Sequence, residues 1–87
     1  MTLKSSVPLQ LRLLNRAIEE HPDAAVNYVL RGEYWLTVDN REAAQADFEQ
    51  AILLGSAELQ ASDWGYLQQA LIDRAKQGLR QAGTGFF

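Results

Sequence analysis

The sequence predicts an all-α fold of antiparallel helical hairpins, and three observations support this class. Apolar residues recur with the three- and four-residue spacing of an α-helix along most of the chain, and no run alternates with the two-residue period of a strand. Short breaks that contain proline, glycine or aspartate divide the chain into four segments, which favours side-by-side packing of neighbouring helices. The length of 87 residues fits one domain.

Residues that commonly begin or end helices bound the four segments. The predicted helices span residues 7–20, 24–38, 40–54 and 57–81, with a break at 62–65 left open, and residues 82–87 form a flexible tail. The residue before a proline avoids the helical region, so the first helix is expected to end near His21 and Pro22. Ser6 and Asp23 are expected to cap the first two helices with their side-chain oxygens.

Two further signals set the limits of the third helix. Asp39 and Glu42 have the spacing of a capping box, in which each side chain accepts a hydrogen bond from the backbone of the other. Gly55 fits the position directly after a helix, where glycine commonly ends it. The third helix is therefore expected to end at Leu54, and the fourth to begin near Ala57.

Composition excludes several classes of function. The chain has no cysteine, which excludes disulfides, thiolate metal sites and thiol catalysis. The net charge of −3 disfavours nucleic acid as a partner. No apolar run approaches the ~18 residues of a membrane-spanning helix, and no signal peptide is apparent. The cytoplasm is therefore the expected location, with no membrane contact.

Residues with catalytic potential are few and scattered. His21 is the only histidine and is expected to lie in a turn. The carboxylates in the pairs Glu19/Glu20 and Asp47/Glu49 are one or two residues apart, so they do not share a helix face, and solvated surface is the expected setting. No phosphate-binding loop, zinc motif or calcium loop is present. We expect neither catalysis, nor a cofactor, nor a metal ion.

A pattern of aromatic and small residues predicts the core of one hairpin. The second predicted helix contributes Tyr28, Gly32 and Trp35, and the third contributes Ala44, Phe48 and Ala51. Small residues allow two helices to approach, and the aromatic rings fill the space between them.

This pattern resembles the tetratricopeptide repeat, over about residues 25–56. Ala17 and Pro22 have the spacing of the end of an earlier repeat, so residues 7–20 resemble its second helix. The resemblance implies one and a half repeats in a right-handed superhelix, closed by a capping helix at 57–81, and a role in binding proteins or peptides. Arg31 replaces the usual leucine, and Ser56 stands in place of the closing proline.

The resemblance also implies a candidate groove on the second predicted helix. Val26, Val29, Glu33 and Leu36 form a stripe beside the hairpin face, at about 100° per residue. This stripe is either a groove for an apolar or amphipathic peptide, or a part of the core that the last helix covers. Glu33 would repel a carboxylate, so we do not expect a clamp for acidic chain ends.

The first predicted helix is apolar on two sides. Leu11, Leu14 and Ile18 cluster on one side, whereas Leu9 and Leu13 lie almost opposite. A second copy or another protein is expected to cover Leu9 and Leu13, with intramolecular cover by the chain ends as the alternative. The sequence thus predicts a non-catalytic protein-protein interaction module. The alternative is a self-associating structural protein, a homodimer through the first helix.

Overall fold

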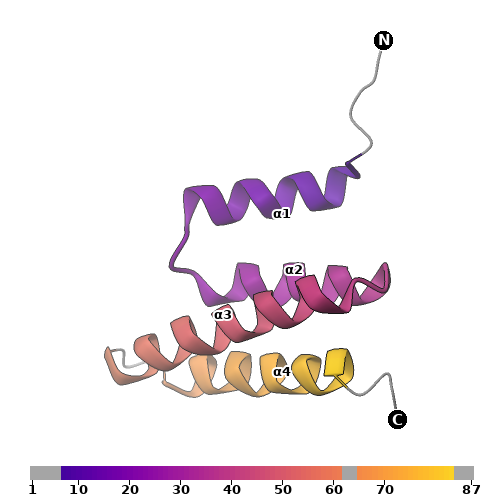
Figure 1. Ribbon diagram of the computed structural model, residues 1–87. Helices are drawn as coiled ribbons and strands as arrows, with labels where there is room; N and C mark the ends of the chain where they lie inside the picture. Colours follow the sequence, from indigo (N-terminus) through magenta and orange to yellow (C-terminus); the bar gives the residue numbers. More distant parts are fainter. Residues whose placement is uncertain (1–6, 62–64, 84–87) are drawn as a thin grey trace.

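A computed structural model describes residues 7–61 and 65–83 of the chain. These residues form four α-helices and no strand, which confirms the all-α prediction. The helices are α1 (Leu9–Glu20), α2 (Ala25–Thr37), α3 (Arg41–Ala61) and α4 (Gly65–Gly83). Helices α2, α3 and α4 pack against one another. Of these three described helices α1 packs against α2 alone, and it forms the outer edge of the array (Figure 1).

The turn between α1 and α2 is closed by backbone hydrogen bonds. The N–H of His21 donates to the carbonyl of Ala17 at 2.9 Å, and the N–H of Ala24 donates to the carbonyl of His21 at 3.2 Å. Ala24 occupies the N-cap position of α2 and makes no side-chain capping bond. The prediction that Asp23 caps this helix is therefore wrong. Ser6, the predicted cap of the first helix, lies outside the described residues.

The turn between α2 and α3 has the hydrogen-bond pattern of a Schellman motif. The N–H of Asn40 donates to the carbonyl of Trp35 at 2.8 Å, and the N–H of Asp39 donates to that of Leu36 at 3.1 Å. Asp39 has φ of 60°, in the left-handed region that such a turn requires. The cap of α3 is Asn40, whose Oδ1 accepts from the N–H of Ala43 at 3.2 Å. The predicted capping box at Asp39 is therefore wrong by one residue.

Helix α3 continues through Gly55, so the prediction that this glycine ends the helix is wrong. A Cβ at this position would lie 3.0 Å from Cγ1 of Ile72 and 3.9 Å from Cβ of Ala25. Gly55 is therefore a point of close approach to α4 and α2. Residues 57–61 belong to α3 and residues 82–83 to α4, whereas 62–64 and the tail at 84–87 lie outside the described residues.

The core centres on Phe48, which is completely buried between two glycines. A Cβ at Gly32 of α2 would lie 2.7 Å from Cε1 of its ring, and one at Gly78 of α4 would lie closer still, against Cζ. The aromatic side chain thus fills the space that two missing Cβ atoms leave on opposite helices. The remaining buried members of this cluster are Val29, Ala44, Ala51, Ala75 and Ala82, and Tyr28 and Trp35 pack against it partly buried.

Candidate partner-binding surfaces

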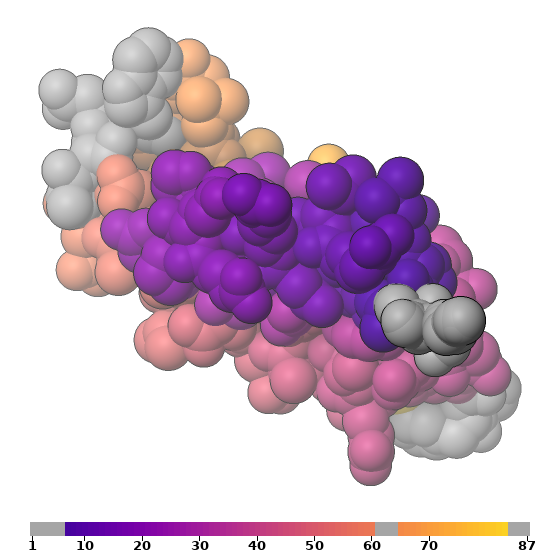
Figure 2. Space-filling view, turned by 90° about the horizontal axis from the view of Figure 1, so that it is seen from above, coloured from indigo at the N-terminus to yellow at the C-terminus, as the bar shows by residue number. Residues whose placement is uncertain are grey.

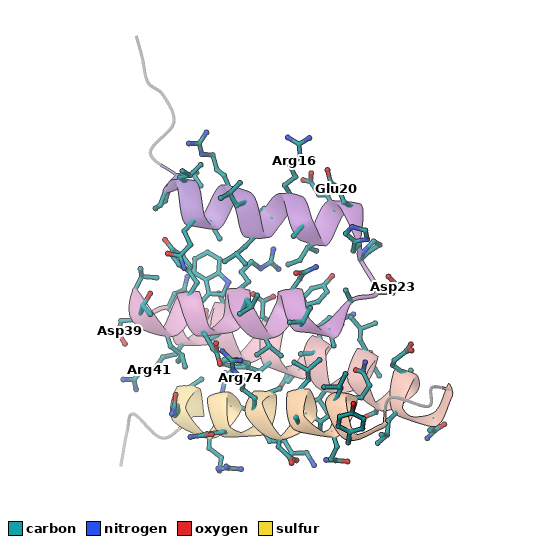
Figure 3. The ribbon with its side chains drawn as sticks, turned by 180° about the vertical axis from the view of Figure 1, so that it is seen from behind. Arg16, Glu20, Asp23, Asp39, Arg41 and Arg74 are labelled. Carbon is teal, nitrogen blue, oxygen red and sulfur yellow. The ribbon has the colours of Figure 1, made fainter. Side chains whose placement is uncertain are left out.

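The stripe that the sequence proposes as a groove does not form one surface. Val29 is completely buried in the core, and Leu36 packs against it. Glu33 pairs with Arg74 of α4, with distances of 2.5 Å from Nε to Oε2 and 2.6 Å from Nη2 to Oε1 (Figure 3). Val26 alone remains open, at 39% exposure. The core and α4 cover most of the stripe, as the alternative interpretation stated.

The outer face of α1 does bring its predicted residues together. Leu9 and Leu13 are 61% and 59% exposed. They share a face with Arg16 and Glu20, because the spacings of three, four and seven residues return to the same side of a helix. The ion pair of Arg16 and Glu20, 3.1 Å long, points away from α2 (Figure 3). The two leucines therefore face outward as well.

The inner face of α1 is only partly covered. Leu11, Leu14 and Ile18 are half-buried, and no residue of the helix is buried. From above, α1 lies over the middle of the molecule, and no other described helix lies above it (Figure 2). The sequence predicted two candidate surfaces. The outer face of α1, defined by Leu9 and Leu13, is the one whose leucines are exposed in the structure.

The sequence analysis missed a largely buried ion pair between Arg31 of α2 and Asp47 of α3. Asp47 is only 5% exposed, so its predicted place on the solvated surface is wrong, whereas Glu49 is exposed. Nε of Arg31 donates to Oδ2 of Asp47 at 2.7 Å, and Nη2 donates to Oδ1 at 2.8 Å. Nε1 of Trp35 donates to the same Oδ2 at 2.9 Å.

The charges of this ion pair are satisfied by hydrogen bonds within the fold. The hydrogen bonds that Arg31 donates to Asp47 raise the pKa of Arg31 above its ordinary value, because they favour the charged guanidinium more than burial disfavours it. Both carboxylate oxygens of Asp47 already accept hydrogen bonds from neighbouring side chains. A signal for this placement was present, because residue 47 falls in the apolar stripe of Ala44, Phe48 and Ala51.

Arg31 also joins α1 to the rest of the molecule. Its Nη1 donates to Oδ1 of Asn15 at 2.9 Å, and the guanidinium lies 5.7 Å from the ring centroid of Tyr28. A second, longer contact runs from Nδ2 of Asn27 to the carbonyl of Ala17, at 3.5 Å. Two side chains of α2 thus hold the middle and the end of α1.

Within residues 7–61 and 65–83, no three His, Cys, Asp or Glu side chains gather as metal ligands. The same ranges contain no enclosed pocket. None of the four described helices has the length and apolarity needed to cross a membrane.

Comparison with known proteins adds no relative. The chain matches no protein-family model, no curated protein and no solved structure. The resemblance to tetratricopeptide repeats therefore depends on the residues between Tyr28 and Ala51, on the pair Ala17 and Pro22, and on their spacing.

Proposed function

We propose that this protein is a non-catalytic protein-protein interaction module that binds an apolar helix or peptide across the outer face of α1. One observation carries the proposal, namely the exposure of two leucines, Leu9 and Leu13, one turn apart on a helix that has no buried residue. Covering the exposed part of each leucine would contribute about 1 kcal/mol to binding.

The resemblance to tetratricopeptide repeats supports the same function, because members of that family bind proteins. In this proposal α2 and α3 are the complete repeat, with Gly32 at the helix crossing. Helix α1 corresponds to the second helix of an incomplete earlier repeat, and α4 is the capping helix of a right-handed stack. A cytoplasmic location belongs to the proposal and agrees with a chain that has no cysteine.

A paired substitution tests the surface. Leu9→Glu with Leu13→Glu places two charges on the outer face of α1, and Leu53→Glu places one on an equally exposed leucine of α3. Each form would be used to enrich proteins from an extract, with circular dichroism as the control for folding. Partners retained by the wild type and by Leu53→Glu, but lost with the double variant, support the proposal. Equal retention by all three forms contradicts it.

Self-association is the second candidate, because a pair of leucines four residues apart is self-complementary. In an antiparallel pairing about a twofold axis, Leu9 of one copy meets Leu13 of the other in both directions. Two 12-residue helices bury less area than a standard interface, so a weak dimer is expected. Sedimentation velocity over a wide range of concentration decides: a mass that stays monomeric throughout excludes this candidate.

A further inference from the structure

Among the described residues, helix α1 is attached to the molecule through one neighbouring helix, α2. Helices α2, α3 and α4 share the buried cluster around Phe48, and each of them packs against the other two. No residue of α1 is buried, and none belongs to this cluster. Opening of α1 therefore leaves the three-helix core intact, as expected for the least stable unit of a fold.

The surface of α2 under α1 is a docking site whose shape and hydrogen bonds are defined. Asn27 and Arg31 are four residues apart on one face of α2, and they bind the carbonyl of Ala17 and the side chain of Asn15. Arg31 is held in place by Asp47 of α3, so its Nη1 remains directed at α1 when α1 leaves. The structure thus shows one helix that fits this site, and that helix is α1 itself.

We propose that α1 is exchanged between two copies of the chain, so that each α1 docks on α2 of the other copy. Because α2 is the one described helix that α1 contacts, the exchange restores every contact that α1 makes with the described helices. Residues 21–24 form the hinge, and Pro22 prevents α1 and α2 from fusing into one helix. Such an exchange is a low-cost route to a twofold dimer.

The exchange uses the inner face of α1, so it does not rest on the proposed function of the outer face. Leu9 and Leu13 remain exposed in either form. A short hinge gives the cis arrangement an effective concentration in the millimolar range. The closed monomer therefore dominates at micromolar concentration, and the exchanged dimer grows as the concentration of chains approaches the millimolar range.

Shortening the hinge tests the proposal directly. Deletion of His21, Asp23 and Ala24 leaves Pro22 as the one residue between α1 and α2, fewer than the two to five that connect antiparallel helices. The full chain with this deletion is expected to be dimeric at micromolar concentration with the helix content of the wild type. A control with three residues inserted at the same place remains monomeric. A deletion variant that is monomeric, with rapid hydrogen exchange along α1, overturns the proposal.

Cross-linking between chains provides a second test that does not alter the hinge. The chain has no cysteine, so Ala17→Cys in one copy and Asn27→Cys in another report only on these positions. When the two are mixed near millimolar concentration, a short bismaleimide is expected to yield several-fold more interchain product than a control pair with Leu53→Cys in place of Ala17→Cys. Yields equal to the control overturn the proposal.

Adding Leu9→Glu and Leu13→Glu to both cysteine variants separates exchange from contact through the outer face. Exchange predicts an unchanged yield of interchain product, because both glutamates lie outside the α1–α2 contact. Loss of the product in this background assigns the association to the outer face and overturns the exchange. If the two glutamates abolish partner capture but leave the cross-link unchanged, the exchange is supported, and the result for capture bears only on the proposed function of the outer face.

Discussion

Helices α1 and α4 are the two outer helices of the described chain, yet only α4 is well buried. Helix α4 buries three small residues, Ala75, Gly78 and Ala82, together with Ile72. Helix α1 directs Leu11, Leu14 and Ile18 inward, and all three stay half-exposed. The inner face of α1 obtains less burial because α2 is the one described helix that it contacts, whereas α4 packs against both α2 and α3. The small residues of α4 also let the ring of Phe48 approach its backbone at Gly78.

The largest effect is expected where α4 closes on α3. Phe48→Ala empties the center of the cluster and should lower the free energy of unfolding by about 3–5 kcal/mol, most of what a small domain possesses. Leu14→Ala on α1 should cost about 1 kcal/mol, since that side chain is only half-buried. Urea denaturation of both variants measures the difference. Equal losses would show that α1 shares the core.

A smaller effect is expected from Gly78→Ala, which adds the methyl group that the ring of Phe48 excludes. Because this ring is completely buried, it has no space into which to move, and the loss should be about 2–3 kcal/mol. Gly83→Ala is the matched control on the same helix, since its Cβ would lie 3.6 Å from Nε2 of Gln45 in ordinary contact. Thermal unfolding measures both variants. A larger loss of stability in Gly83→Ala than in Gly78→Ala would contradict this account of α4.

Asp47→Ala tests whether the ion pair behind α1 supports the core. The change leaves Arg31 and the indole N–H of Trp35 without their acceptor, at a cost of about 2 kcal/mol. Arg31 retains some access to water, which keeps the loss below that of a fully buried pair. Glu49→Ala, two residues along the same helix and exposed, should change stability by less than about 0.5 kcal/mol. Denaturant unfolding of the two variants should separate them.

Local signals in the sequence predicted the positions of the helices better than the contacts between them. Spacing and turn residues identified the four helices, because both act over a few residues. The roles of Gly55 and Gly78 depend on Ile72 and Phe48, which are 17 and 30 residues distant, so no local pattern distinguishes a contact glycine from a terminating one.

The same reasoning separates the two candidate surfaces. Leu9 and Leu13 were identifiable because a helix with one neighbour needs only one apolar face, and α1 carries two. The burial of the stripe containing Val29 and Leu36 could not be identified in the same way, because helical periodicity does not indicate how many neighbours a helix has. Helix α2 contacts three other helices, so more than one of its sides is buried.

The smallest effect, and the sharpest test of the contrast between α1 and α4, is expected from Asn15→Ala. The change removes the acceptor that Nη1 of Arg31 uses, which costs about 1 kcal/mol. If α1 opens on its own, this loss should appear as faster hydrogen exchange along α1, with no change at the amides of α3 beside Phe48. Gln10→Ala, exposed on the same helix, is the control and should alter neither. A parallel loss of protection in α1 and α3 would mean that the four helices unfold as one unit, and α1 could then not leave its site while the core persists.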